Sequence, residues 1–182
     1  IKEHFKQSRI ILTTWDSEKD KVNNLPEIDF IFNEDPGAAC DDLNGIKRDN
    51  INRQIVSSSA GLKIAKSKYV IKTRTDIFFK NNNILKYYKE DLERDPNYKV
   101  FENFILQPNY NVKNPRKIDI VFHPGDLLLF GLTTDVRNYY DCRLRTVDES
   151  MYHKYNNSND LKIYPNLLTR KTEEAYLWTE FL

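Results

Sequence analysis

The sequence of 182 residues is poor in cysteine, lacks long apolar runs and carries no large excess of charge of one sign. Cys40 and Cys142 alone cannot form the disulfide framework of a small secreted domain, which favours a reduced, cytosolic protein. No apolar run approaches the roughly 20 residues that a membrane-spanning helix needs. Since the sequence has 28 basic and 27 acidic residues, a basic surface for binding nucleic acid is not expected.

Several catalytic motifs are also absent from the sequence. There is no P-loop, no HExxH pair and no recognisable Ser/His/Asp set, which argues against hydrolases of those kinds. The stretch TTWDSEKDK at the end of the first predicted strand has no glycine, whereas a sugar nucleotidyltransferase should carry a glycine-rich, basic loop there. The residues around Cys40 show no metal-ligand spacing.

What remains is the composition of one globular domain. Apolar residues make up 40% of the chain, and a chain of this length buries about 70% of its unfolded surface. The sequence begins without methionine or a signal-like start and stops within the amphipathic pattern YLWTEFL. We therefore expect residues 1–182 to be a single domain cut from a longer protein.

Strand and helix patterns alternate along the chain, which predicts an α/β domain of three layers with a mainly parallel central sheet. The predicted strands are residues 9–14, 29–33, 69–76, 100–107, 127–131 and 161–164. The predicted helices are residues 18–24, 52–65, 83–94, 133–140 and 171–182.

The stretch from residue 52 to residue 76 organises this pattern. Its helix has an apolar stripe at helical spacing, formed by Ile51, Ile55, Leu62 and Ala65. Its strand begins apolar and then turns polar, and alternate residues of a strand point to the same face. That face carries Lys72, Arg74 and Asp76. Charges at the carboxyl end of a central strand are costly unless they meet a ligand, so we place the active site at residues 74–76.

The same stretch carries a family resemblance. The run NRQ from residue 52, the pair GL from residue 61 and the run YVIKTRTD from residue 69 resemble the WavE family of lipopolysaccharide-synthesis proteins. The resemblance is specific over residues 10–76 and looser to residue 182. More broadly, the pattern is similar to nucleotide-sugar glycosyltransferases of GT-A fold, which implies a three-layer, Rossmann-like domain.

The resemblance implies an inverting sugar transfer from a nucleotide-sugar to a bacterial cell-surface glycan, such as lipopolysaccharide core or capsule. The partners would be the nucleotide-sugar and an oligosaccharide or lipid-linked acceptor, without nucleic acid. The protein would act in the cytoplasm, at the inner face of the inner membrane, held there by other parts of the full-length chain. Two alternatives stay open: a non-catalytic glycosyltransferase-like module that binds glycan or a partner, and a sugar nucleotidyltransferase.

Candidate nucleotide contacts lie at the carboxyl ends of the first two predicted strands. Thr14, Trp15 and Asp16 offer a hydroxyl, an aromatic face and a carboxylate for a base and ribose. The resemblance favours this role over a helix cap with Trp15 in the core. Asp35 follows the second strand and is either a ribose contact or an exposed turn carboxylate. Arg53 offers a planar pair of donors for a diphosphate, an assignment that rests mainly on the resemblance.

Most enzymes of the resembled fold hold Mn²⁺ or Mg²⁺ with two acids one residue apart, but here Arg74 replaces the first acid. Two arrangements stay open. Asp76 holds the metal with help from elsewhere, or Lys72 and Arg74 neutralise the diphosphate without a metal. Either arrangement would stabilise negative charge on the departing diphosphate. A third, purely structural alternative is an ion pair between Arg74 and Asp76.

Acceptor-side candidates lie later in the chain, beginning with the turn HPGD from residue 123. The resemblance makes Asp126 an acceptor-contacting carboxylate, while His123 is a sugar contact or an ordinary surface histidine. Inverting enzymes of this fold often place the catalytic base at a helix start. There the resemblance selects Glu174, with Glu173 next and Asp126 as a less favoured base. Both glutamates could equally serve only to complement the helix dipole.

Overall fold

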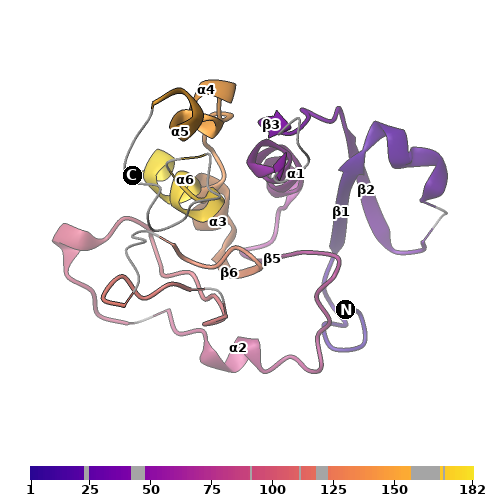
Figure 1. The fold of residues 1–182 in the computed structure, drawn as a ribbon. Coiled ribbons are helices and arrows are strands. Elements are labelled where there is room, and N and C mark those ends of the chain that lie inside the picture. The colour runs from indigo at the N-terminus through magenta and orange to yellow at the C-terminus, as the bar shows by residue number, and fades with distance from the viewer. Residues whose placement is uncertain are drawn as a thin grey trace.

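The computed structural model places helix α1 (Ile51–Ile64) in the middle of the molecule (Figure 1). A pair of strands, β1 (Ile10–Trp15) and β2 (Ile28–Asn33), lies on one side of this helix, and helices α3 (Thr133–Tyr139) and α6 (Glu173–Phe181) lie on the other. The structure describes residues 1–22, 25–41, 48–90, 92–110, 112–117, 123–156, 169 and 171–182. The helix that organises the sequence pattern therefore also occupies the centre of the fold.

Strands β1 (Ile10–Trp15) and β2 (Ile28–Asn33) confirm the first two predicted strands and their parallel pairing. The strands pair along their whole length, so both carboxyl ends lie at the same edge of the sheet. The segment between them begins with a 3-10 helix, η1 (Asp16–Lys21), which differs from the helix predicted over residues 18–24.

The buried face of α1 confirms the predicted apolar stripe. Ile51, Ile55 and Leu62 are at most 3% exposed, and Ala65, just after the helix, is 7% exposed. Another face of α1 lies against β1 at Gly61, where an added Cβ would come within 3.1 Å of Cγ2 of Thr13. The missing side chain at this position lets the helix approach the strand closely.

Strand β5 (Tyr69–Thr73) pairs antiparallel with β6 (Leu128–Leu132). Every residue of β6 is buried, as expected for the strand predicted over residues 127–131. The strand predicted over residues 100–107 is reduced to one antiparallel bridge between Leu106 and Phe130. Just before α1, β3 (Cys40–Asp41) and β4 (Arg48–Asp49) form a further short antiparallel pair.

The described residues thus form three separate two-stranded sheets, one parallel and two antiparallel. This differs from the single, mainly parallel central sheet that the sequence predicts, and the three-layer arrangement is not seen in this part of the chain. The mixed α/β class is confirmed. The difference has a simple cause: alternation of side chains is the same whichever way a strand runs, so it identifies strands without giving their direction.

The main core lies between α1, β6 and two helices, α3 (Thr133–Tyr139) and α6 (Glu173–Phe181). Its buried residues are Ala39, Ile51, Ile55, Leu62, Leu129, Val136, Tyr139, Tyr140, Tyr176 and Leu177. Helix α6 confirms the prediction for the last segment and begins after Thr172, whose hydroxyl accepts a hydrogen bond from the Ala175 amide at 3.2 Å.

The helix predicted over residues 83–94 is reduced to one turn, α2 (Ile84–Tyr87). The next residue, Tyr88, has an extended backbone, and its ring lies 4.9 Å from that of Phe130 and 5.6 Å from that of Tyr69. Aromatic packing of this kind is worth more than the weak helix propensity of a short polar segment. The helix therefore ends where Tyr88 joins the aromatic cluster.

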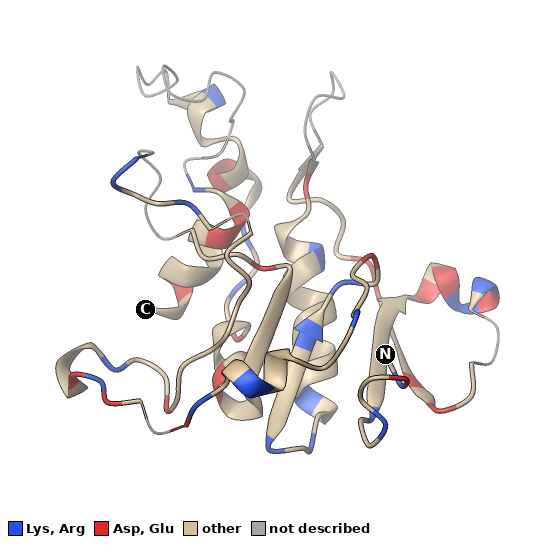
Figure 2. Ribbon diagram, turned by 90° about the horizontal axis from the view of Figure 1, so that it is seen from below, with Lys and Arg blue, Asp and Glu red and all other residues tan. Residues whose placement is uncertain are grey.

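Three more short helices complete the elements of the described ranges: η2 (Pro96–Tyr98), α4 (Val147–Ser150) and α5 (Tyr152–Tyr155). The strand predicted over residues 161–164 lies outside the described residues. Basic and acidic residues are interspersed along the ribbon (Figure 2). Within the described ranges, no helix combines the length and the apolar character that crossing a membrane requires.

Candidate functional site

The first turn of α1 joins two groups of predicted site residues that lie far apart in the sequence. Arg53 donates two hydrogen bonds to Asp35, from Nε at 2.8 Å and from Nη2 at 2.7 Å. The next residue, Gln54, donates from Nε2 to Oδ2 of Asp126. Helix α1 therefore holds the turn after β2 on one side and the turn before β6 on the other.

Thr14, Trp15 and Asp16 lie at the carboxyl end of β1, beside the end of β2. The carbonyl of Thr14 accepts a hydrogen bond from Nδ2 of Asn33 at 3.1 Å, Trp15 is half-buried and Asp16 is exposed. Helix η1 begins at Asp16 without a side-chain cap, and Trp15 lies outside the main core. The cap alternative is therefore not observed, and contact with a nucleoside stays a prediction.

The carboxylate of Asp35 is held by protein groups. Besides the two bonds from Arg53, it accepts a hydrogen bond from the Gly37 amide at 3.0 Å. The hydrogen bonds from Arg53 hold the pKa of Asp35 below its usual value. Arg53 also donates to Oδ1 of Asn50 at 2.9 Å. Its guanidinium is therefore already oriented, and a diphosphate would share it with Asp35.

The three charged residues predicted on one face at the end of β5 have different surroundings. Lys72 donates from Nζ to the carbonyl of Asp126 at 2.9 Å and lies 5.1 Å from the ring centre of Tyr140. Burial lowers the pKa of Lys72 to about 8, against the opposing charge of Asp126. Arg74 and Asp76 are exposed and form a two-point ion pair, at 3.0 and 2.8 Å. The structural alternative for that pair is thus present.

The lowered pKa of Lys72 predicts a pH dependence of folding stability. Its ordinary pKa is 10.5, so from about pH 8 to about pH 10 the unfolded state binds more protons than the folded state. The contribution of Lys72 to the free energy of unfolding should therefore rise by about 2 kcal/mol across that window. Burial raises the pKa of Cys142, Tyr139, Tyr140 and Tyr176, which acts in the opposite direction, so the contribution of Lys72 is measured against variants. In urea unfolding at a series of pH values, the free energy of unfolding of the wild type should rise by about 2 kcal/mol relative to Lys72→Met, but not relative to Lys66→Met, at an exposed lysine. A difference between wild type and Lys72→Met that does not change with pH would contradict the prediction.

The start of α6 brings Glu173 to the start of α1. Oε1 of Glu173 accepts a hydrogen bond from the backbone amide of Asn50 at 3.1 Å. Burial raises the pKa of Glu173 to about 7, and the negative charges of Asp49, Glu174 and Asp126 add to the rise. A carboxyl group with this pKa exists in both protonation states near neutral pH, which suits a general base.

Glu174, the base that the resemblance selects, is paired with His123. Its Oε2 lies 3.1 Å from Nε2 of His123, and the two side chains are 17% and 8% exposed. Nδ1 of His123 is buried without a hydrogen-bond partner among the described residues. His123 is therefore not an ordinary surface histidine, and its ring orients the Glu174 carboxylate.

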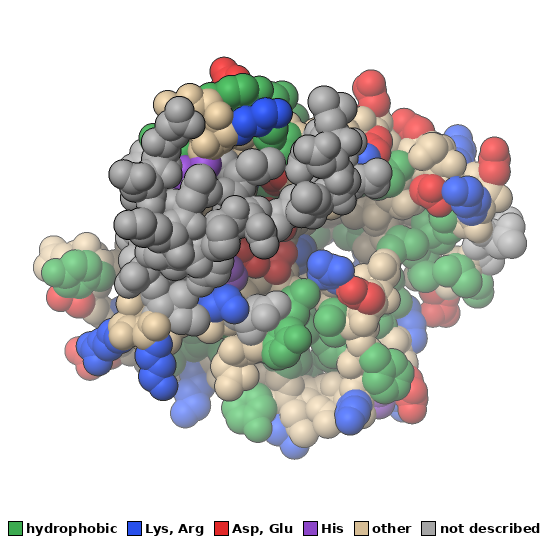
Figure 3. Space-filling view, viewed as in Figure 1, with side chains coloured by type: hydrophobic (Ala, Val, Ile, Leu, Met, Phe, Trp, Pro, Cys, Tyr) green, Lys and Arg blue, Asp and Glu red, His purple; other side chains and the backbone are tan. Residues whose placement is uncertain are grey.

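Asp126 lies at the centre of these groups. Its carbonyl binds Lys72 and its carboxylate binds Gln54. The hydrogen bonds that Arg74 donates to Asp76 are the largest cause of the raised pKa of Arg74, and the charges of Asp126 and Glu173 add to that rise. We call Lys72, Arg74, Asp126 and Glu173 the charged cluster. In Figure 3, acidic and histidine side chains lie deep in the middle of the visible face, beside basic ones.

The geometry at Asp76 does not fit a divalent metal site. Both carboxylate oxygens accept hydrogen bonds from Arg74, so a cation there would have to displace a guanidinium. The described part of the chain contains no group of three His, Cys, Asp or Glu side chains that could hold a metal ion. Mg²⁺ and Mn²⁺ need carboxylate oxygens that are free to face the metal.

Sequence reasoning missed two residues behind this site, Asp49 and Arg145. They form an ion pair at 2.7 Å in which the side chains are 6% and 1% exposed. Asp49 stands three residues before the helix predicted over residues 52–65, where an acidic residue is common and signals no more than a nearby helix start. Nothing in the sequence pairs it with a residue 96 positions later.

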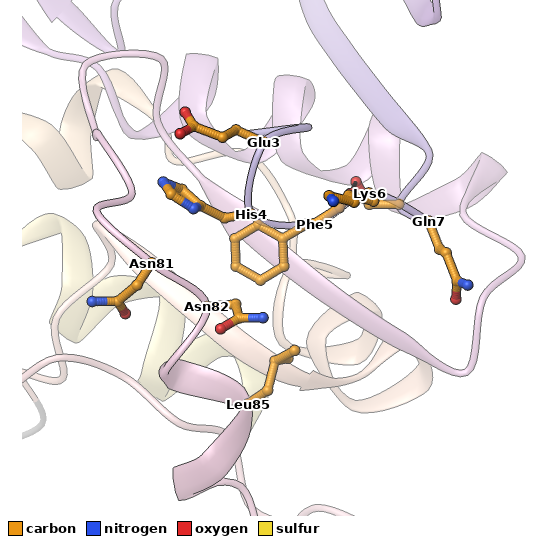
Figure 4. Close-up of a pocket in the computed structure, with 9 residues that line it drawn as sticks. Glu3, His4, Phe5, Lys6, Gln7, Asn81, Asn82 and Leu85 are labelled. Carbon is orange, nitrogen blue, oxygen red and sulfur yellow. Dashed lines mark hydrogen bonds between the residues drawn. The ribbon is translucent and has the colours of Figure 1, made fainter.

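A hollow lies elsewhere on the molecule, between the N-terminal segment and the loop before α2 (Figure 4). Its lining includes His4, Phe5, Asn81, Asn82 and Leu85. The ring of Phe5 also packs edge-on against that of Phe79, at 5.2 Å. None of the predicted site residues lines this hollow.

A family model described as WavE lipopolysaccharide synthesis matches residues 1–181, nearly the whole chain. The matched range includes every predicted site residue and the charged cluster. No curated protein and no solved structure matches the chain.

Proposed function

Because the chain belongs to the WavE family of lipopolysaccharide synthesis, we propose that it transfers a sugar from a nucleotide-sugar to a growing bacterial cell-surface glycan. The acceptor is lipopolysaccharide core or capsule, as an oligosaccharide or a lipid-linked glycan met at the inner face of the inner membrane. The chain is then a domain of GT-A type. The observation that carries the proposal is the charged cluster, where basic groups stand beside a carboxyl group with a pKa near 7.

On the donor side, the carboxyl ends of β1 and β2 receive the nucleoside. Trp15 offers an aromatic face to the base, and Thr14, Asp16 and Asp35 offer oxygens to the ribose hydroxyls. Arg53 lies at the start of α1, within reach of the Asp35 carboxylate. Its guanidinium can turn part of its donor set to a phosphate oxygen, since arginine presents several donors in one plane.

On the acceptor side, Glu173 is the base that the geometry favours, with Glu174 and Asp126 as the alternatives that the resemblance implies. Ionised Glu173 takes the proton of the acceptor hydroxyl while that oxygen attacks the anomeric carbon. The bond from this carbon to the diphosphate oxygen breaks, and the departing nucleoside diphosphate keeps the electron pair. A single displacement of this kind inverts the configuration at the anomeric carbon.

The negative charge of the departing diphosphate is balanced by Arg74, with Lys72 behind it. Arg74 is exposed and carries a forked donor set that suits phosphate oxygens. Lys72 contributes its charge from a buried position, where charges interact more strongly than in water. In this arrangement the two cations stabilise the negative charge of the departing diphosphate, as Mn²⁺ or Mg²⁺ bound to a pair of acids does in other enzymes of this fold.

Nucleotide binding without a metal is the first test of this proposal. We expect one of UDP, GDP, CDP and CMP to raise the melting temperature of the protein in the absence of Mn²⁺. At a free concentration about 100-fold above Kd, the stabilisation should be about 2.7 kcal/mol. The identity of that nucleotide would also narrow the range of donor sugars.

The same screen separates the alternatives. A shift that requires Mn²⁺ would support a metal at Asp76 and contradict the metal-free arrangement. No shift with any nucleotide would contradict sugar transfer and favour the non-catalytic glycan- or partner-binding module. Stabilisation by a nucleoside triphosphate together with a sugar phosphate, but by no diphosphate, would favour the sugar nucleotidyltransferase.

A further inference from the structure

A buried ion pair between Asp49 and Arg145 lies directly behind the proposed base. Nη1 of Arg145 donates to Oδ2 of Asp49 at 2.7 Å, and Ser150 donates its hydroxyl to the same oxygen at 2.8 Å. The other carboxylate oxygen accepts the backbone amide of Ile51 at 3.1 Å, in the first turn of α1. The guanidinium lies over the ring of Tyr176, 4.3 Å from its centre. Both charged groups are therefore fully engaged.

The rest of Arg145 binds the chain at the starts of both helices. Nη2 donates to the carbonyls of Lys171 and Thr172, at 3.2 and 3.1 Å, just before α6. The backbone of Arg145 exchanges two hydrogen bonds with the side chain of Asn52 in α1, at 2.9 and 2.8 Å. Arg145 thus joins the first turn of α1 to the N-cap of α6, through its side chain on one side and its backbone on the other.

Stability alone is a poor reason for burying this pair, because desolvation of two charges offsets much of their attraction. Its position offers another reason. Asp49 is followed by Asn50, whose amide donates to Glu173, and Arg145 holds the residue that precedes Glu173. We propose that Asp49 and Arg145 are positioning residues that lock the first turn of α6 against the first turn of α1 and so aim the Glu173 carboxylate. This deepens the proposed function, on which the role of Glu173 as base rests.

Charged groups face Glu173 from four places in the fold. Asp49 before α1, Asp126 before β6 and Glu174 on α6 carry negative charge, and Arg74 after β5 carries positive charge. Burial is the largest cause of the raised pKa of Glu173, and Asp49 is the largest of the charges. Asp49→Asn should therefore lower this pKa, and the unbalanced Arg145 would lower it further. Arg145→Gln should raise the pKa of Glu173, because the negative charge of Asp49 is then no longer balanced by the positive charge of Arg145.

Because the Asn50 amide donates a hydrogen bond to Glu173, its chemical shift reports the protonation of Glu173 directly. The test therefore needs no measurement of enzyme activity. In the full ¹⁵N-labelled chain, the Asn50 amide shift should titrate with a midpoint near 7. We expect Asp49→Asn to lower the midpoint by at least about half a pH unit and Arg145→Gln to raise it by a similar amount. Damage to folding alone gives no such opposite pair of shifts. Asp148→Asn, at an exposed acid on α4, should leave the midpoint unchanged.

Arg145→Lys separates positioning from charge. Lysine keeps the positive charge but lacks the fork that binds the two carbonyls before α6. The midpoint of the Asn50 amide titration should stay unchanged, while the hydrogen of that amide should exchange faster with solvent. The kcat for sugar transfer should fall with little change in KM.

An Asn50 amide that does not titrate in the wild-type chain would overturn the inference, whether or not the variants fold. Equal midpoints in Asp49→Asn and wild type would overturn it as well. Failure of the proposed function has a different signature: the amide midpoints move as expected, yet no nucleotide binds and no sugar is transferred.

Discussion

Glu173→Gln should lower kcat for sugar transfer by about 10²- to 10⁴-fold while nucleotide binding stays nearly unchanged. Glutamine keeps the shape of the side chain, and its carbonyl oxygen can still accept the Asn50 amide, but it cannot take a proton. In the wild type, kcat/KM should rise with pH as Glu173 loses its proton, with an apparent pKa near 7. The variant should lose that rise. Initial rates measured from about pH 5 to about pH 9, with the donor found in the nucleotide screen, test both statements.

Two variants on the same helix serve as comparisons. Glu180→Gln, which removes an acid beside Arg143 at the far end of α6, should leave kcat unchanged. Glu174→Gln removes the charge that His123 pairs with and tests the base implied by the resemblance. Activity that survives in Glu173→Gln and is lost in Glu174→Gln would move the role of base to Glu174.

Arg74→Met should lower kcat/KM by about 10²- to 10³-fold, because it removes the exposed cation that, in the proposed mechanism, balances the charge of the departing diphosphate. Lys72 cannot replace it, since its ammonium group is buried and already donates to the Asp126 carbonyl. Affinity for a nucleoside diphosphate should fall more than affinity for the matching monophosphate, which carries less negative charge. Calorimetric titration of both nucleotides against wild type and variant measures this difference.

Arg9→Met is the matched control for Arg74→Met. The two arginine side chains are 50% and 53% exposed, and each pairs with one aspartate. The control should bind and turn over like the wild type. Asp76→Asn should cost less than about tenfold if Asp76 only orients Arg74. A loss as large as that of Arg74→Met, together with a requirement for Mn²⁺, would contradict this role and make Asp76 a metal ligand.

Elements with one strongly buried face could be predicted from the sequence. The stripe of Ile51, Ile55 and Leu62 identified α1, and the apolar run at residues 127–131 identified β6, because burial imposes a period on the apolar residues. The prediction of a helix over residues 83–94 was wrong because contacts with distant residues decided the structure there. The pattern of this segment was correct for a helix, but Tyr88 packs on rings from distant strands, which a local pattern does not contain.

The candidate site, too, could be predicted from the sequence only in part. Alternation along β5 brought Lys72, Arg74 and Asp76 to attention, but it did not separate a buried lysine bound to Asp126 from an exposed arginine paired with Asp76. Those partners lie 54 and 2 positions away in the chain, and only the nearer one was considered from the sequence. Likewise, the two glutamates at the start of α6 were recognised as candidate bases without a reason to prefer Glu173.

By itself, the sequence determined the family, the central place of α1 and which side chains are chemically able to serve a diphosphate and a proton transfer. These follow from residue identity and short-range periodicity. Only the tertiary structure decided which of those side chains meet, since Arg53 with Asp35, Gln54 with Asp126 and Asn50 with Glu173 are contacts across the fold. It also decided the pKa values of Lys72 and Glu173, because protonation depends on burial and on charges brought close by other elements.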